Sequence, residues 1–178
     1  MQEVGRKRSA GTRAAIIGAF NRIFLERRQR RIRVADVVAE AGVGRSTFYD
    51  HFSGAEQLYL AALARPFTVL ADAAAGCGDP AALDRLLAHF WENRRRARDS
   101  LGGRAGEQSQ RLLAELVEAR LEGPLALPAS LAAQQLAAAA LAPVRCWLLG
   151  HASSTPAGLA ESLCRSGAAL AAAQRAGH

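Results

Sequence analysis

A short segment around two phenylalanines carries an unusual concentration of hydrogen-bonding side chains. Residues 45–52 read Arg-Ser-Thr-Phe-Tyr-Asp-His-Phe, and Phe48 and Phe52 are one helical turn apart. If both rings point into a core, the other side chains face outward or lie at the edge of that face. These side chains are Arg45, Ser46, Thr47, Tyr49, Asp50 and His51.

The outward side chains have the donors, acceptors and lengths that reach the base edges and phosphates of duplex DNA. Arg45 could pair with O6 and N7 of guanine, and Ser46 is small enough to let the backbone approach a base. Thr47 and Tyr49 could donate to a phosphate or a base edge. Two alternatives stay open: Tyr49 could be a surface aromatic packed on a neighbour, and His51 could be a phosphate ligand or an ordinary edge residue.

The residues before this segment predict the helix that must position it. Apolar residues from Val34 to Ala41 recur at i, i+3, i+4 and i+7, which is typical of a short amphipathic helix. Gly42 ends this helix, because glycine adopts a positive φ without a Cβ clash, and Val43 fills the angle between two helices. The pattern predicts a helix-turn-helix whose second helix lies in the major groove.

Helices are also predicted on both sides of this motif. Thr12 would cap a first helix, with residues 1–11 as a mobile basic tail. The apolar stripe of that helix is Ile16, Phe20, Ile23 and Phe24. Ala and Leu dominate the rest of the chain, so we expect an all-α protein. Its predicted parts are a three-helix helix-turn-helix domain at residues 1–54 and a helical domain at residues 55–178.

Basic residues are concentrated in the first third of the chain. Residues 1–52 hold eleven Lys or Arg against five Asp or Glu, whereas residues 53–178 hold twelve against eleven. This asymmetry indicates that the basic N-terminal third binds a polyanion, whereas the rest of the chain is nearly neutral. The basic runs at residues 6–8 and 27–33 could alternatively be solvated faces, because such runs have several interpretations.

Composition and spacing argue against several other classes. No apolar run reaches the roughly 18 residues of a membrane span, and the basic N-terminus lacks an apolar signal region, so we expect a cytoplasmic protein. Cys77, Cys146 and Cys164 are far apart, which favours reduced thiols over a zinc site or a disulfide framework and leaves redox sensing as an alternative. No nucleophilic triad, metal-ligand spacing or phosphate loop is visible, so the sequence predicts neither an enzyme nor a cofactor.

The motif resembles the DNA-binding domain of the tetracycline-repressor-like (TetR) family of bacterial transcriptional regulators. The shared residues are Val38-Ala39, Ala41-Gly42-Val43, Thr47-Phe48-Tyr49, His51-Phe52 and Leu58. The resemblance implies a homodimeric repressor that binds an inverted-repeat operator in double-stranded DNA. It also implies a C-terminal domain that dimerises and binds a small effector. The alternative is a helical module that uses the helix-turn-helix for protein contacts.

Three residues depart from the family pattern. Gly44 stands where a serine usually caps the recognition helix, and Ala55 replaces a lysine that approaches phosphate. Arg33 replaces a Thr or Ser cap and could supply the phosphate contact that Ala55 cannot make. The predicted DNA-binding residues are therefore Arg33, Arg45, Ser46, Thr47, Tyr49 and His51.

Aromatic residues in the C-terminal part are candidates for effector contacts. A body rich in Leu and Ala has few large side chains, so clustered aromatics could leave an apolar cavity for a neutral or anionic, mostly hydrophobic ligand. Ordinary core packing is the alternative. The candidates are Phe67, Phe90, Trp91 and Trp147.

The last two helices resemble those of one TetR subgroup over about residues 135–175. In that subgroup they pair with their mates in a four-helix dimer interface. The resemblance implies a homodimer through these helices, in which Ala160 and Gly167 would allow the subunits to approach closely.

Overall fold

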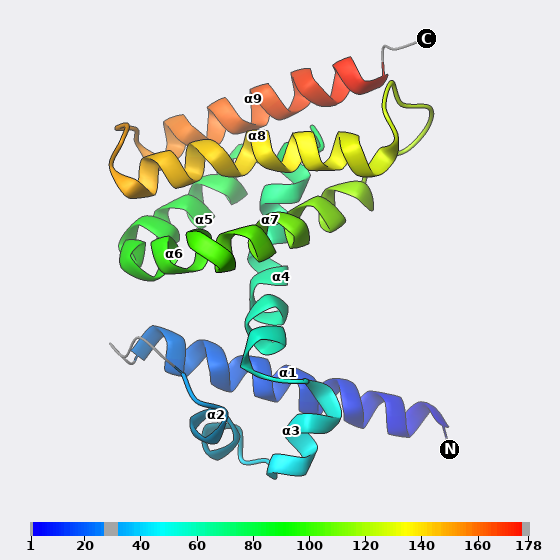
Figure 1. The fold of residues 1–178 in the computed structure, drawn as a ribbon, viewed down its shortest axis with the longest axis vertical. Coiled ribbons are helices and arrows are strands. Elements are labelled where there is room, and N and C mark those ends of the chain that lie inside the picture. Colours follow the sequence, from blue (N-terminus) through cyan, green and yellow to red (C-terminus); the bar gives the residue numbers. More distant parts are fainter. Residues whose placement is uncertain (1, 27–31, 176–178) are drawn as a thin grey trace. The chain divides into compact units, whose positions relative to one another are not determined.

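The computed structural model describes residues 2–26 and 32–175, and every regular element in this part of the chain is an α-helix. The all-α prediction is therefore confirmed. The helices (Figure 1) are α1 (Gln2–Glu26), α2 (Val34–Ala41), α3 (Arg45–His51), α4 (Ala55–Ala74), α5 (Pro80–Glu92), α6 (Arg94–Leu101), α7 (Gly103–Glu118), α8 (Ala129–Leu149) and α9 (Pro156–Arg175).

The helices form two compact units, Met1–Leu63 and Ala64–His178. The domain boundary predicted after residue 54 precedes α4, whereas the contacts divide the chain within that helix. The reason is that Leu58, in the first turn of α4, packs into the core of the N-terminal unit.

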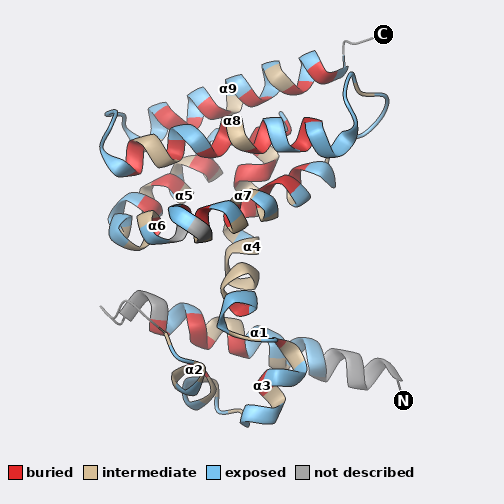
Figure 2. Ribbon diagram, viewed as in Figure 1, coloured by how far each residue is buried: buried red, intermediate tan, exposed pale blue. Residues whose placement is uncertain are grey.

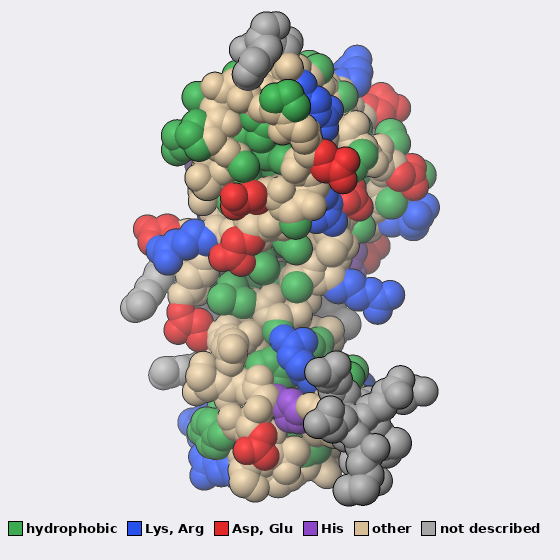
Figure 3. Space-filling view, turned by 90° about the vertical axis from the view of Figure 1, so that its right-hand side faces the viewer, with side chains coloured by type: hydrophobic (Ala, Val, Ile, Leu, Met, Phe, Trp, Pro, Cys, Tyr) green, Lys and Arg blue, Asp and Glu red, His purple; other side chains and the backbone are tan. Residues whose placement is uncertain are grey.

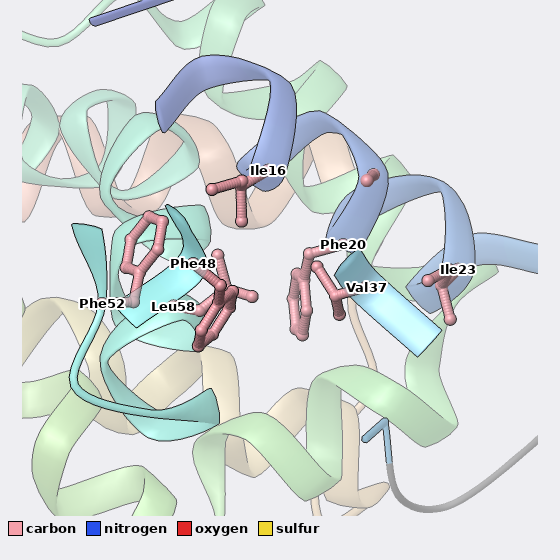
Figure 4. Packing of buried hydrophobic residues seen from close by; sticks show 8 residues of the cluster. Ile16, Phe20, Ile23, Val37, Phe48, Phe52 and Leu58 are labelled. Carbon is pink, nitrogen blue, oxygen red and sulfur yellow. The ribbon is translucent and has the colours of Figure 1, made fainter. Parts of the chain in front are cut away.

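One apolar cluster holds the N-terminal unit together. Ile16, Phe20 and Ile23 of α1 have the predicted helical spacing and are at most 5% exposed. The cluster also contains Val37 of α2, Phe48 of α3 and Leu58 of α4, together with Phe52, which directly follows α3 (Figure 4). The side chain of Phe24, the fourth member of the predicted stripe, lies outside the described residues.

The first helix is longer than the sequence pattern predicts. α1 begins at Gln2, so Thr12 lies inside the helix and the prediction of a mobile tail is wrong for the backbone of residues 2–11. Arg, Lys, Glu and Ala in this stretch all favour helix, and its two glycines each cost only about 1 kcal/mol. The predicted N-cap, Thr12, is therefore not where this helix begins.

The turn between α2 and α3 forms as predicted around Gly42. Its φ is 65°, in the left-handed region, and its N–H donates to Ala39 O at 3.3 Å. The next N–H, of Val43, donates to Val38 O at 3.1 Å. These two bonds satisfy the last carbonyls of α2 and reverse the chain toward α3. Gly44, with extended backbone, occupies the N-cap of α3.

The C-terminal unit is a bundle of α5 to α9 with the second half of α4. α7 packs against α8, α5 against α9, and α8 lies beside α9 (Figure 1). Buried and exposed residues alternate along these helices, because each helix turns one face toward the bundle and another toward solvent (Figure 2). The largest fully buried aliphatic side chains are Leu70, Leu83, Leu87, Leu113, Leu136, Leu141 and Leu148. Within the described ranges, no helix combines the length and the apolar character needed to cross a membrane.

Small residues let α9 approach α4 closely within the C-terminal unit. A Cβ added to Gly167 would lie 2.9 Å from the carbonyl carbon of Ala73. Ala160 is fully buried, and Leu163 is 4% exposed. These residues therefore serve contacts between helices of one chain, and the predicted use of Ala160 and Gly167 between subunits is not compatible with this burial.

Candidate nucleic-acid interface

The buried and exposed residues of α3 divide as the spacing predicts. Phe48 and Phe52 are 0% and 1% exposed, with their ring centroids 5.7 Å apart. The predicted outward residues Arg45 and Ser46 are exposed, whereas Thr47 and His51 are intermediate. The helix therefore presents a short polar surface, and the two rings that fix it to the core are visible in Figure 4.

Tyr49 is the large aromatic residue of this surface. It is 53% exposed, and its ring meets the ring of Phe48 edge-on, with 5.3 Å between centroids and an interplanar angle of 89°. The buried ring thus supports the exposed one from beneath. Such support restricts the phenol without covering it, so Tyr49 keeps a large contact surface for a partner.

The arginines around α3 have different surroundings. Arg33 is exposed at the N-cap of α2, and its side chain makes no capping hydrogen bond. Arg13 of α1 lies over the ring of Phe52, 5.1 Å from the centroid, in a cation–π contact. Arg22 of α1 forms an ion pair with Glu40 of α2 at 2.8 Å. Arg33 is therefore available to an anion, whereas Arg22 is already partnered.

The structure describes only part of the charged surface. On the face shown in Figure 3, most acidic side chains lie over the C-terminal bundle. The side chains of the basic run at residues 6–8, and most of the run at 27–33, lie outside the described residues. The basic excess of residues 1–52 is accordingly a property of the sequence rather than of a mapped patch.

The comparisons agree with this geometry. Residues 16–62 match the family model described as bacterial regulatory proteins, tetR family. This match includes α2 and α3 with parts of α1 and α4, so the likeness to that family is confined to the N-terminal unit. Within the matched residues, α2 and α3 are the two helices of the helix-turn-helix. No curated protein matches the chain significantly.

A solved structure extends the likeness to the whole fold. It is the crystal structure of a TetR transcriptional regulator from Streptococcus agalactiae 2603V, with a TM-score of 0.52 and 24% sequence identity. The match covers 93% of this chain and 98% of that one. At this identity the likeness establishes the fold, which is an N-terminal helix-turn-helix followed by a helical domain.

The four aromatic residues predicted to contact an effector are not equivalent. Phe67 is fully buried and Phe90 is 9% exposed. Trp91 of α5 stacks on Trp147 of α8 at 4.8 Å, with 23° between the ring planes. Trp147 Nε1 donates to Ser154 O at 2.9 Å, which satisfies the buried indole. These contacts fit the packing alternative, and ligand binding by the four residues stays a prediction.

A pocket lies elsewhere in the C-terminal unit and was missed by sequence reasoning. Its volume is about 250 Å³, and it is lined by Arg98, Leu101, Gly102, Gly103, Arg145, Leu148 and Leu149. One available signal was Arg145, the sole charged residue of the Ala- and Leu-rich α8. A lone charge at a half-buried helix position usually has a specific partner or a functional use.

Proposed function

We propose that this chain is a TetR-family, ligand-responsive repressor that binds an inverted-repeat operator as a homodimer and acts in the cytoplasm. The observation that carries the proposal is the polar surface of α3. Arg45, Ser46 and Tyr49 are exposed on a helix whose other side is fixed by two buried phenylalanines. A rigid, exposed helix of this kind fits the major groove.

Each residue of that surface has a proposed partner on the DNA. Arg45 pairs with guanine, and Ser46 with a base or a thymine methyl. Thr47 and Tyr49 donate to phosphate or to a base edge, and His51 contacts phosphate. Arg33 binds the backbone beside α2, because its guanidinium is exposed and unused as a cap.

The homodimer is proposed to form through exposed residues of the last two helices. α8 leaves Leu131 57% exposed, with Ala142 exposed farther along the helix. Ala169 and Ala172 are exposed on α9. Small and apolar side chains on two adjacent helices allow a second copy to approach across a two-fold axis.

The response to an effector requires a difference in affinity between two states. A small hydrophobic molecule bound in the C-terminal unit would release the operator only if it binds more tightly to a dimer with a different spacing of recognition helices. Equal affinity for both states would shift nothing.

Selection from a random DNA pool tests the proposed function. We expect the enriched sequences to be inverted repeats, because a two-fold dimer presents two identical helices. A single asymmetric site bound by one protomer would contradict the homodimer. If the helix-turn-helix serves protein contacts instead, binding to random duplex DNA will lack a steep dependence on salt.

A further inference from the structure

The pocket of the C-terminal unit lies between α6, the turn into α7 and the end of α8. Its volume of about 250 Å³ is slightly below the roughly 300–1,000 Å³ of common ligand pockets. Leu101 and Leu148 are buried beside it, and Leu149 is 51% exposed at its edge. The pocket therefore suits a small molecule with a compact apolar body.

Two arginines give this apolar pocket its charge. Arg145 Nη2 donates to Gly106 O at 2.6 Å, while Arg145 Nε is buried and has no hydrogen-bond partner. Arg98 Nε donates to the carbonyl oxygen of Leu148. No carboxylate of the described residues forms an ion pair with either guanidinium. Leaving a buried donor without an acceptor is unfavourable, so an anion placed here would supply a hydrogen bond that the free protein lacks.

Local structure holds Arg145 in this position. A Cβ added to Gly106 would lie 2.8 Å from the carbonyl carbon of Leu101 and 2.7 Å from Arg145 Nη2, so glycine gives room to both the end of α6 and the guanidinium. Positive charge also extends along α6, which reads Arg-Arg-Arg-Ala-Arg at residues 94–98. This potential favours anions and disfavours cations in the pocket.

We infer that the pocket binds a small carboxylate with a compact apolar body, and that this carboxylate is the effector; the second statement rests on the proposed function. A planar carboxylate accepts from guanidinium nitrogens in the fork geometry that arginine offers. The buried Nε of Arg145 gains the acceptor it lacks. The apolar body of the ligand packs against the leucines, whose exposed edge at Leu149 it covers.

Calorimetry on the full chain tests binding, with benzoate and hexanoate as probes and benzamide and hexanamide as neutral controls of matched shape. We expect both carboxylates to bind saturably and the amides to bind about tenfold more weakly or worse, since a charge-assisted hydrogen bond contributes roughly 1.5–3 kcal/mol. Arg145→Met and Arg98→Met should weaken carboxylate binding by a similar factor. Arg85→Met, which removes an exposed arginine of α5, should leave it unchanged.

A second variant keeps the test decisive if Arg145→Met does not fold. Leu149→Gln retains both arginines and changes a residue that is already half exposed, and it should weaken hexanoate binding several-fold by removing apolar contact. Equal binding of amides and carboxylates would overturn the inference. So would wild-type affinity in both Leu149→Gln and Arg98→Met, or the absence of saturable binding.

Operator release is measured separately, by fluorescence anisotropy of labelled operator DNA. We expect release by the same carboxylates and not by the amides. Saturable binding without release would show that the carboxylate is not the effector and would leave the DNA-binding function intact. Failure of the unliganded protein to bind any operator would contradict the proposed function, while calorimetry would still decide what the pocket binds.

Discussion

At the scale of single residues, Phe48 and Phe52 determine which side chains of α3 are exposed. Their rings are buried 5.7 Å apart, so Arg45, Ser46 and Tyr49 are exposed. The sequence predicted this division because it depends only on helical period. Contacts between distant residues, such as Arg13 with Phe52 or Arg145 with Gly106, depend on how helices pack, and no local pattern contains that information.

Replacing Arg45 or Tyr49 by alanine tests the exposed surface. Each variant should weaken operator binding by about 1–3 kcal/mol per half-site, because a base or phosphate contact is lost. Neither should reduce thermal stability strongly, since both side chains are exposed. Anisotropy titrations at fixed salt measure the affinity. Wild-type affinity in both variants would show that another face of α3 meets the DNA.

Phe48→Ala serves as the contrasting variant. Phe48 is fully buried, so its truncation should destabilise the N-terminal unit by about 3–5 kcal/mol. Urea denaturation followed by circular dichroism measures this loss. A Phe48→Ala protein as stable as wild type would contradict the core assignment on which the exposed surface depends.

At the scale of elements, the turn after α2 was predictable and the start of α1 was not. Glycine at a helix end is a strong local signal, because few residues adopt positive φ without strain. The start of α1 carries no such signal: Gly5, Gly11 and Thr12 all resemble breaks or caps in the sequence, yet the helix continues through them. Favourable neighbours and packing of the apolar stripe outweigh these residues.

Gly42→Ala measures the strain that glycine avoids at this turn. A Cβ there would meet no atom within 4 Å, so the expected loss of about 1–2 kcal/mol comes from the left-handed backbone alone. Gly54→Ala is the matched control, since it also has open space and lacks a positive φ. Urea denaturation compares the two variants. Equal stability would show that positive φ at Gly42 does not limit this turn.

Gly11→Ala tests the extended first helix. Gly11 lies inside α1 with open space around a Cβ, so alanine should raise helix stability by about 0.5–1 kcal/mol. The gain should appear as a higher urea midpoint with an unchanged slope. No change would indicate that the helix begins after Gly11 in solution, as the Thr12 cap predicted.

At the scale of the whole molecule, the order of domains and the helical class followed from composition and one specific motif. The residues of the proposed homodimer interface did not follow from either. Gly167 and Ala160 were assigned to a subunit interface from their small size, yet they are buried within one chain. Small residues permit close approach to any neighbour, so size alone does not identify the neighbour. Exposure in the folded unit leaves Leu131, Ala142 and Leu149 of α8 and the exposed alanines of α9 among the candidates.

Ala142→Glu tests the proposed subunit interface. Ala142 is exposed in the folded chain, so the substitution should preserve the circular dichroism spectrum and thermal unfolding of the unit. Across a two-fold axis it places like charges near each other, and dimerisation should weaken about tenfold or more. Sedimentation velocity measures this shift in the monomer–dimer equilibrium. Ser162→Glu, at an exposed position of α9, makes the same test on the other helix. An unchanged dimer in both variants would place the interface elsewhere.

The last prediction concerns the charge of the N-terminal third. Deleting residues 2–9 removes Arg6, Lys7 and Arg8 together with Glu3. If these cations neutralise phosphates, each one lost should reduce the slope of log K against log salt concentration by about 0.9. The deletion also shortens α1, but the core residues Ile16, Phe20 and Ile23 remain, so circular dichroism should show a folded protein.

Operator titrations from low to moderate salt give the slope. A second variant, in which glutamine replaces the three cations, removes the charge but keeps the helix, so it separates loss of charge from loss of helix. A flatter slope in both variants would show that the segment follows the DNA backbone. An unchanged slope in the glutamine variant would show that the three cations remain solvated, and the basic asymmetry of the chain would then contribute to DNA binding only through the other arginines of residues 1–52.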